Sequence, residues 1–555
     1  MCLRKVILLF SLVISYGCSF SQTNAITAKQ LFKYILKPVP TKKGMDFKIN
    51  VEFKSDSTIT FTSPIDYYGV KDYGQHFKEF KGENGTIVNM TAQKNQYIAK
   101  PNNQGIVYID YILSLSQEEM NSISYAPNIS PTHFHLAGSQ WILPIGSLEK
   151  INAYHVKIVD YPKGWNFYSS ESNSPLNMTF ESTYEQLIGS GFGGGNQQHK
   201  IFFIKGKPVS IFVQGKYDIG TDSIIEATRK IIKFQRDWFQ DYSQPYYTVT
   251  ICNRSNNVAG TSFPNLFVCF VMPEANKLQL FKLLSHEMFH RWLPNRLVIK
   301  TEENESSLKY AWFYEGFTDY FSRKILLEAG IINKKEFINS LNTDLYLIAN
   351  NKSANETYSQ MLERREQHKF SGEQNKLYYY KGCLMALKWD AQIQQKNPQK
   401  SLKQLLLELM EQAKKGKNEE IDFQYLVDKG NEYGINVKED FNHYIIQGKD
   451  VVLNSKSFNS DYILKITKLP LFQKGFEVDY GEVSTIKEVV KYSNAYKAGL
   501  RKGMVYLGAK NSYIFGNAWM PDKPILVQVQ IGGKEKTVTY KPEGKLIKIQ
   551  QFVKN

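Results

Sequence analysis

The sequence His286-Glu287-Met288-Phe289-His290 places two histidines four residues apart, with a glutamate directly after the first. On a helix, four residues make just over one turn, so His286 and His290 project from one face toward a common point. Two imidazoles at this spacing can bind one zinc ion. Glu287 is offset by one residue, beside the open position of such a metal, where a carboxylate can take a proton from bound water. The motif therefore indicates metal-assisted hydrolysis.

A catalytic zinc needs a third protein ligand, and Glu315 supplies a candidate 25 residues beyond His290. Glu315 lies in an apolar segment predicted to be helical, where a carboxylate without a partner would be costly. Asp319 is one turn further on and faces the same way, so it could accept the second N–H of a zinc-bound histidine. The motif alone is weak, because it occurs by chance and charged pairs on helices are usually solvated. Its apolar setting and the second acidic segment favour a metal site.

Two segments resemble the glycyl aminopeptidase family of metallopeptidases, which belongs to the gluzincin group: Ser285–Trp292 and Trp312–Tyr320. The resemblance implies a multidomain α+β fold that covers nearly the whole mature chain. The expected parts are an N-terminal β-sandwich, a thermolysin-like and mainly helical catalytic domain, and a C-terminal PDZ-like β domain. It also implies Zn²⁺ as cofactor and a peptide or protein as substrate.

A third segment, Tyr378–Gly382, resembles the Tyr-x-Lys-Gly element of the same family. In this register, Tyr379 takes the place of the tyrosine that stabilises the oxyanion, and a phenol is a suitable donor for that purpose. The alternative is a tyrosine-rich start of a helix that packs on the core.

One segment departs from the family pattern. Members carry a Gly-Gly-Leu-Glu-His-like strand before the zinc helix, whose glutamate can hold the amino terminus of the substrate. The corresponding stretch here, Ala259–Leu266, contains no acidic residue and no histidine. A buried ammonium needs a carboxylate partner. We therefore expect a cleft that accepts blocked or internal peptides, unless an acid from another loop replaces the missing one.

The pattern of the whole chain fits this arrangement. At about 100–200 residues per domain, 555 residues indicate three or four domains. Apolar and polar residues alternate up to about residue 170, which predicts strands such as 47–53 and 105–113 around a turn at Asn84-Gly85. From Pro273 to Pro294 and on to about residue 450 the apolar spacing is helical. The predicted boundaries are 1–21 for a signal peptide, 22–170 for the β-sandwich, 171–454 for the catalytic domain and 455–555 for the PDZ-like domain.

The N-terminus predicts export to the periplasm or the medium. Arg4 and Lys5 precede the apolar stretch Val6–Ile14, and cleavage before Gln22 would fit a signal peptide. Cys18 offers the alternative of a lipid anchor. We find no later run of about 18 apolar residues, so no transmembrane helix is expected in the mature chain.

Several other residues leave two interpretations open. Cys252 and Cys269 could form a disulfide or be two buried thiols on strands, and Cys383 is the third cysteine after cleavage. His133 and His135 could share a metal, although no third ligand is near in sequence. The glycine-rich stretch Gly189–Gly195 lacks the spacing of a nucleotide-binding loop, and we interpret it as a flexible turn or a loop at the edge of a cleft.

The formal charge of +16 arises from 69 basic and 53 acidic residues. The lysines are scattered among acids without a long basic run, so we expect no nucleic-acid partner. Near the C-terminus, Ser493–Met504 resembles the Ala-Gly-Leu element of PDZ domains, and Gly475-Phe476 would be the carboxylate-binding loop. Such a loop could bind a C-terminal peptide, or this part could be a purely structural cap.

The sequence thus predicts an exported zinc metallopeptidase with ligands His286, His290 and Glu315, general base Glu287 and oxyanion donor Tyr379. Two alternatives stay open. The first is a catalytically silent protein of the same fold that acts through its PDZ-like domain. The second is a zinc hydrolase of another amide or ester.

Overall fold

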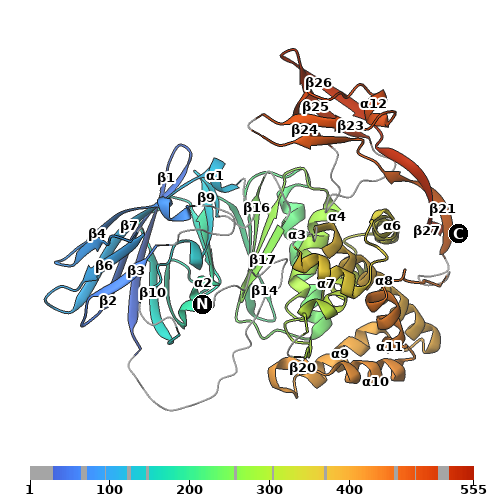
Figure 1. The fold of residues 1–555 in the computed structure, drawn as a ribbon. Helices are drawn as coiled ribbons and strands as arrows, with labels where there is room; N and C mark the ends of the chain where they lie inside the picture. The colour runs from blue at the N-terminus through green and yellow to red at the C-terminus, as the bar shows by residue number, and fades with distance from the viewer. Residues whose placement is uncertain are drawn as a thin grey trace. The chain divides into compact units, whose positions relative to one another are not determined.

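The computed structural model describes residues 29–63, 72–93, 95–121, 127–145, 149–254, 259–302, 305–367, 372–454, 461–481, 483–510 and 524–555. The predicted signal peptide and Cys18 lie outside these residues. The chain is a multidomain, mixed α+β protein, and it divides into two compact units at residues 288 and 289. Figure 1 shows the strand-rich N-terminal part, the helical middle and the C-terminal strands.

The N-terminal unit begins with antiparallel and mixed sheets. A six-stranded sheet has the order β12-β10-β1-β2-β7-β4, a four-stranded sheet has the order β11-β13-β9-β8, and a small sheet has the order β3-β6-β5. The six-stranded sheet includes β12, which lies beyond the predicted boundary at residue 170. The strands are β1 Leu31–Pro40, β2 Gly44–Lys54, β3 Ile59–Thr62, β4 Phe77–Gly82, β5 Ile87–Met90, β6 Gln96–Lys100, β7 Ile106–Ser116, β8 Asn128–Ser130, β9 His133–Ala137, β10 Asn152–Ile158, β11 Asn166–Ser169, β12 Asn177–Ser182 and β13 Gly191–Gly195.

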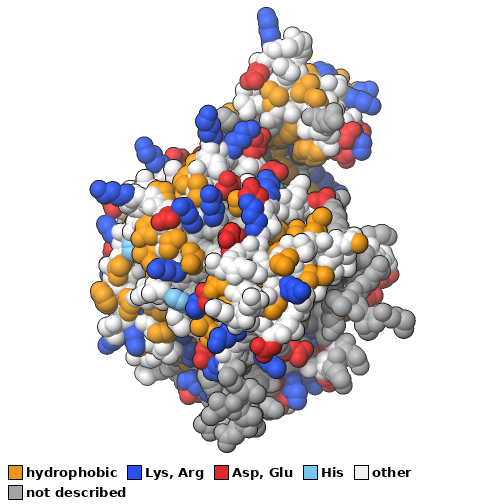
Figure 2. Space-filling view, turned by 90° about the vertical axis from the view of Figure 1, so that its left-hand side faces the viewer, with side chains coloured by type: hydrophobic (Ala, Val, Ile, Leu, Met, Phe, Trp, Pro, Cys, Tyr) orange, Lys and Arg blue, Asp and Glu red, His pale blue; other side chains and the backbone are white. Residues whose placement is uncertain are grey.

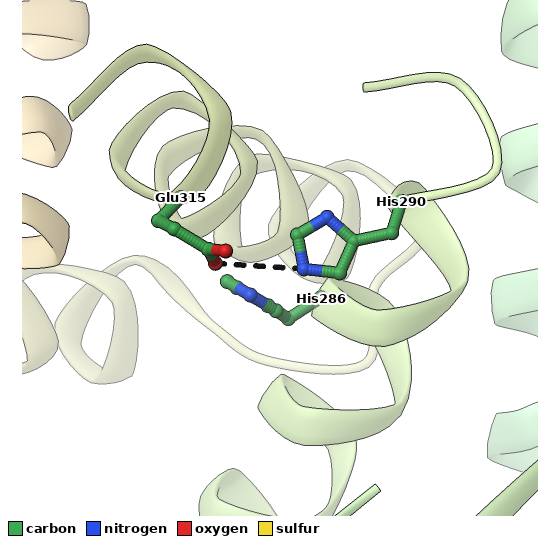
Figure 3. Close-up of side chains that lie close together, drawn as sticks. All are labelled: His286, His290 and Glu315. Carbon is green, nitrogen blue, oxygen red and sulfur yellow. Dashed lines mark ion pairs between the residues drawn. The ribbon is translucent and has the colours of Figure 1, made fainter. Parts of the chain in front are cut away.

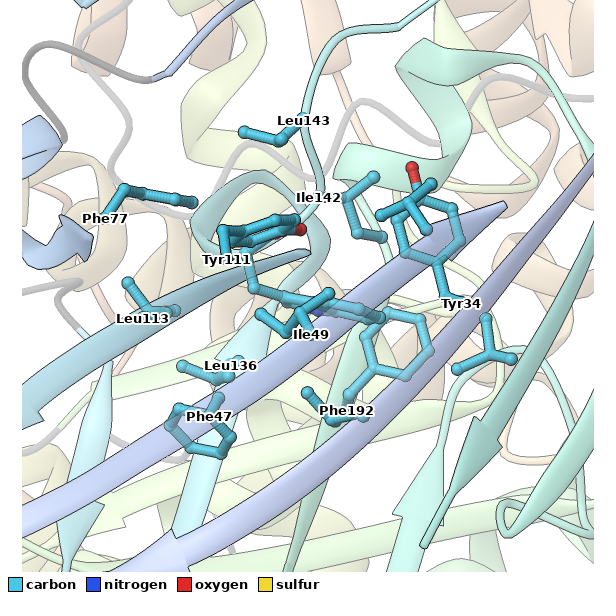
Figure 4. Close-up of a cluster of buried hydrophobic side chains, with 14 of the residues drawn as sticks. Tyr34, Phe47, Ile49, Phe77, Tyr111, Leu113, Leu136, Ile142, Leu143 and Phe192 are labelled. Carbon is cyan, nitrogen blue, oxygen red and sulfur yellow. The ribbon is translucent and has the colours of Figure 1, made fainter. Parts of the chain in front are cut away.

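The core of these sheets consists of the buried side chains that occur at every second position along the strands. In β7 every second residue from Val107 to Leu115 is buried, because successive side chains of a strand point to opposite faces. Figure 4 shows the resulting cluster, in which Tyr34, Phe47 and Tyr111 from the six-stranded sheet lie with Phe192 of β13. The hydroxyl of Tyr111 donates to the carbonyl oxygen of Trp141 at 2.7 Å, so its one polar atom is satisfied inside the core. The predicted turn at Asn84-Gly85 is confirmed by positive φ angles of 51° and 84°.

The glycine-rich stretch is a buried strand, and its interpretation as a flexible loop was wrong. β13 pairs with β11 and β9, and all five of its residues are buried. A Cβ on Gly193 would lie 2.2 Å from the ring of Tyr168, and a Cβ on Gly194 would lie 2.3 Å from the ring of Phe167. Glycine is needed here because aromatic rings from the neighbouring strand cover the backbone.

A five-stranded sheet follows in the same unit, with the order β14-β15-β16-β18-β17. The strands β15, β16 and β18 are parallel, and β17 pairs antiparallel with β18 at the edge of the sheet. Cys252 and Cys269 lie on β16 and β18 as free, buried thiols. The interpretation as two buried thiols is thus confirmed, and the alternative of a disulfide was wrong. The elements are β14 Gln198–Ile204, β15 Lys207–Val213, α3 Thr221–Phe239, β16 Tyr247–Asn253, β17 Ala259–Phe263, β18 Leu266–Val271 and α4 Lys277–Phe289.

The second unit is mainly helical up to residue 446. Helix ends follow local capping signals: Ser401, for example, caps α9 by accepting from the backbone N–H of Gln404. Helix α9, Leu402–Ala413, lies within the stretch that was predicted to be helical. The elements are β19 Val298–Ile299, η4 Trp312–Phe317, α5 Thr318–Glu328, α6 Lys334–Asn350, α7 Tyr358–Glu366, α8 Gly372–Lys396, α9 Leu402–Ala413, β20 Glu420–Ile421, α10 Phe423–Tyr433, α11 Val437–Asp440 and η6 Phe441–Ile446.

Strands return after residue 461. A two-stranded ribbon of β21 and β27 is bound to α6 through its backbone: Asn342 donates to Phe552 O at 2.9 Å and accepts from Phe552 N at 2.7 Å. A five-stranded sheet has the order β22-β23-β24-β25-β26. Its identity as a PDZ-like domain stays a prediction. The elements are β21 Tyr462–Phe472, β22 Phe476–Asp479, β23 Thr485–Val489, α12 Asn494–Lys497, β24 Val505–Lys510, β25 Ile525–Ile531, β26 Lys534–Tyr540 and β27 Glu543–Lys554.

On the face drawn in Figure 2, lysine and arginine side chains are scattered among acidic and hydrophobic ones and do not gather in one patch. Among the described residues, no helix has the length and apolar character needed to cross a bilayer.

Candidate metal centre

The two histidines lie at the C-terminal end of α4. The helix begins at Lys277, and Pro273 lies before it in a turn where Ala275 N donates to Met272 O, so the predicted start at Pro273 was wrong. The last helical residue is Phe289, which leaves His290 in the turn that follows. Gln235 of α3 donates to Ser285 O at 2.7 Å and to Ser285 Oγ at 3.1 Å. This buried amide therefore holds the helical turn that carries His286.

His290 is oriented by its own backbone. Its Nδ1 lies 2.8 Å from the carbonyl oxygen of Leu293, so Nδ1–H donates there and Nε2 faces Glu315. Nε2 and Glu315 Oε2 are 3.5 Å apart. Figure 3 marks this pair with a dashed line. The ligand atoms of His286, His290 and Glu315 all lie within 4.8 Å of one another, the single such group among the described residues.

This group fits a zinc ion in donor type and in spacing. Ligand atoms about 2.0–2.1 Å from a tetrahedral zinc are about 3.3 Å apart, close to the separation of 3.5 Å between His290 Nε2 and Glu315 Oε2. Two imidazoles and one carboxylate also form a ligand set that leaves a fourth position for water or substrate. The structure thus brings together the three side chains that the sequence predicts as ligands.

Glu315 lies in a π-helical turn, η4, which continues into α5. Such turns are rare and occur often at functional sites. Buried aromatic rings hold η4 in place: the ring centroid of Trp389 is 5.7 Å from that of Trp312 and 5.3 Å from that of Phe317. The hydroxyl of Tyr314 accepts from Ile299 N at 2.7 Å. The sequence predicts a helix here but carries no signal for its π-helical winding.

Asp319 lies one turn beyond Glu315 and is buried. Its Oδ2 accepts from Arg323 Nη2 at 2.8 Å, and Arg323 also pairs with Asp344 at 2.7 Å. The charge of Asp319 is therefore balanced within the helical core. Its predicted role as an acceptor for a ligand histidine stays a prediction.

Helix α8, which carries Tyr379, touches η4 through two glycines. A Cβ on Gly316 would lie 2.3 Å from the Cα of Gly382, and a Cβ on Gly382 would lie 2.1 Å from Trp312 O. The two backbones are thus in direct contact one residue beyond Glu315. Tyr379 is half-buried on α8, about one turn before this contact. Its role as oxyanion donor stays a prediction.

Lys381, next to Gly382, anchors α8 on its other side. Its buried ammonium donates to the carbonyl oxygens of Ala354 at 2.6 Å, Gly448 at 2.8 Å and Lys449 at 3.1 Å. Burial lowers the pKa of Lys381 to about 8. The sequence shows this lysine only as part of a motif, because its carbonyl partners are distant in the chain.

The edge strand β17 lies against Glu287. A Cβ on Gly260 would be 3.0 Å from Glu287 Cγ and 2.7 Å from Cε2 of Phe267. Glu287 itself is buried and is 7% exposed. The acid-free strand thus lies beside the predicted general base, a contact at Gly260 that sequence reasoning missed.

The His133 and His135 pair belongs to the hydrogen bonding of the N-terminal sheets. His133 Nδ1 is 2.8 Å from Ser130 Oγ, and His135 Nδ1 is 3.4 Å from the hydroxyl of Tyr168. Burial lowers the pKa of His133 to about 4, and burial together with Arg254 lowers that of His135 to about 3. No described His, Cys, Asp or Glu joins them in a group of three metal ligands.

Residues 279–385 match the M61 glycyl aminopeptidase family. The predicted resemblance is confirmed. This match covers α4, η4 and the start of α8, the elements that carry the three candidate ligands and Tyr379. The match and the ligand group together indicate a metallopeptidase.

An aminopeptidase N family protein from Idiomarina loihiensis has the same fold, with a TM-score of 0.63 and 16% identity over 93% of this chain and 97% of that one. An M1 zinc metallopeptidase from Deinococcus radiodurans is 11% identical, with a TM-score of 0.39, over 76% of this chain and 95% of that one. No curated protein matches the sequence significantly.

Proposed function

We propose that this protein is an exported zinc metallopeptidase that hydrolyses peptide bonds. The observation that carries the proposal is the convergence of His286, His290 and Glu315 at ligand distance, inside a segment that matches a peptidase family. A zinc ion bound there would supply a Lewis acid and a bound water of lowered pKa. We assign the surrounding parts to a β-sandwich, a thermolysin-like catalytic domain and a PDZ-like domain.

The remaining catalytic roles are assigned to residues of the chain itself. Glu287 follows the first ligand in α4, so its carboxylate can accept the proton of the attacking water and return it to the leaving amine. Its buried position against β17 limits the rotamers that it can adopt. Tyr379 would donate a hydrogen bond to the oxyanion as charge develops on the scissile carbonyl. β17 is the edge strand of its sheet and lies beside Glu287, where an extended peptide could add as a further strand.

Replacing Glu287 by glutamine tests this proposal. The Glu287→Gln variant of mature protein (residues 22–555) should keep its fold and its zinc but lose turnover by about 10²–10⁴-fold, since only the proton acceptor is removed. Digestion of a broad peptide library, followed by mass spectrometry, measures activity. Glu274→Gln is the matched control, because Glu274 is exposed just before α4. A wild-type protein that holds zinc and cleaves no library peptide would contradict the proposal and favour the silent binding protein.

A further inference from the structure

A cavity apart from the metal centre lies between helices α5, α6 and α8. Its volume is about 280 Å³, and neither the three candidate ligands nor Glu287 or Tyr379 line it. At about 30 Å³ for each water of the bulk liquid, this space equals about nine water molecules. It is therefore large enough for a small organic molecule and too small for a peptide of several residues.

The walls of the cavity come from two helices whose polar residues recur at helical spacing. On α5 these residues are Tyr320, Lys324 and Glu328, each one turn after the last. On α8, Asp390 and Gln394 follow one another at the same spacing. Residues four apart on a helix share one face, with Cβ atoms about 5–6 Å apart. Each helix thus turns a row of polar side chains toward the same cavity.

The positive group of the cavity is the ammonium of Lys324, which Asp390 holds in place. The buried carboxylate of Asp390 accepts from Lys324 and from the hydroxyl of Tyr320, the latter at 2.6 Å. It also accepts from Leu402 N at 2.9 Å. An ammonium has three N–H donors, and Asp390 takes one of those of Lys324. The others can bind an anionic group in the cavity, for which a carboxylate is well suited.

The negative group is the carboxylate of Glu328, at the exposed end of the cavity. Lys324 forms its ion pair with Asp390, and no lysine, arginine or histidine of the described residues forms one with Glu328. The positive charges of Lys324 and Lys403 act on Glu328 from a greater distance. One helix face therefore presents an ammonium and, one turn further on, a carboxylate. This pair of charges is complementary to a zwitterion.

The base of the cavity is apolar. Phe337 of α6 and Leu387 of α8 line it and are 1% and 2% exposed, and Leu327 of α5 lies beside them. An apolar group of a ligand would leave water on entering this part, which favours binding. A concave, partly apolar site with a few converging polar groups is typical of small-molecule binding.

We propose that this cavity binds a free α-amino acid with an apolar side chain. Glu328 accepts hydrogen bonds from its α-ammonium group, Lys324 donates to its α-carboxylate, and its side chain packs on Phe337 and Leu387. The two charges of an α-amino acid are separated by two bonds, about 2.5 Å, so groups one helical turn apart can hold both. The proposal goes beyond the peptidase function and does not depend on it, because binding needs neither the metal nor turnover. The alternative is a cavity that holds only water.

Isothermal titration calorimetry of the mature protein with leucine tests the proposal. Leucine should bind, whereas leucinamide and N-acetylleucine should each bind about 10–100-fold more weakly, because each loses one charge and its hydrogen bond. Glycine keeps both charges and should also bind at least about 10-fold more weakly, because it has no side chain to bury. Equal binding of leucine and either blocked compound would overturn the assignment.

Two variants place the binding in this cavity. Glu328→Gln should weaken leucine binding by about 10–100-fold. Ala391→Leu should abolish it, because Ala391 lines the cavity from α8 and a larger side chain would fill part of the space. Leucine also favours a helix, so this substitution suits its position. A thermal unfolding curve for each variant shows that it is folded at the assay temperature.

Two further variants serve as controls. Glu366→Gln changes an exposed glutamate at the end of α7, outside the cavity, and should bind leucine as the wild type does. His286→Ala removes a candidate metal ligand and should also bind leucine normally, which separates this site from the metal centre. Loss of leucine binding in His286→Ala would overturn the proposal, and so would unchanged binding in both Glu328→Gln and Ala391→Leu. A wild type that does not bind leucine would overturn it as well, while leaving the peptidase proposal intact.

Discussion

Adding one methyl group to Gly260 should disable the general base without touching the metal. The Cβ of alanine at this position would lie 2.7 Å and 2.8 Å from two ring atoms of Phe267 and 3.0 Å from Glu287 Cγ. Carbon atoms in normal contact are about 3.5–4.0 Å apart. Both neighbours must therefore be displaced relative to β17 by about 0.5–1 Å. Because the ring of Phe267 is fully buried and can shift little, we expect the strand to be pushed away from the ring and the Glu287 side chain to change its position.

A shift of about 1 Å at a reacting group can cost about 10²-fold in rate. We expect Gly260→Ala to lower kcat by about 10–100-fold with bound zinc unchanged, since neither histidine is among the nearest contacts of Gly260. Overpacking should also cost about 1–3 kcal/mol of stability. Steady-state kinetics with a chromogenic peptide, metal content by mass spectrometry and a urea unfolding curve measure the three quantities.

Gly481→Ala is the control for the substitution itself, because a Cβ there meets only Val483 O, at 3.9 Å. It should leave kcat and zinc content as in wild type. If Gly260→Ala kept the wild-type kcat with full zinc content, Glu287 would not depend on β17 for its position. If zinc were lost together with activity, the effect would lie in the fold of α4 and not in the base.

Three further predictions follow from the same geometry. His286→Ala and Glu315→Ala should each remove bound zinc, as measured by mass spectrometry. A full zinc content in both variants would contradict the ligand assignment. Tyr379→Phe should lower kcat with little change in KM, because a phenol that acts only in the transition state contributes nothing to substrate binding; an unchanged kcat would move the oxyanion role elsewhere. The folded pKa values of His133 and His135, about 4 and about 3, lie below the ordinary 6.5, so the unfolded chain takes up protons first as pH falls. The free energy of unfolding should have its full value above pH 6.5 and be lower by up to about 2 kcal/mol per histidine at pH 5. Urea unfolding of the His135→Gln variant should show a weaker pH dependence than that of the wild type.

The sequence was sufficient for features that depend on local spacing. His286 and His290 could be assigned because four residues on a helix define one face, and Glu315 because a carboxylate in an apolar segment needs a partner. The glycines of β13 were misinterpreted, since glycine marks both turns and strands covered by aromatic rings. The aromatic rings that cover these glycines, such as that of Tyr168, come from another strand. Local spacing carries no information about such pairings.

The contacts that position the site are tertiary: they join residues that are distant in the sequence. Gln235 holds the turn that carries His286, and the contact between Gly316 and Gly382 sets α8 against the turn that carries Glu315. Neither glycine can be replaced without separating two backbones. A site in which ligands must stay within a few tenths of an ångström requires such support. The candidate metal ligands can therefore be predicted from the sequence, whereas the contacts that hold them in place are seen only in the fold.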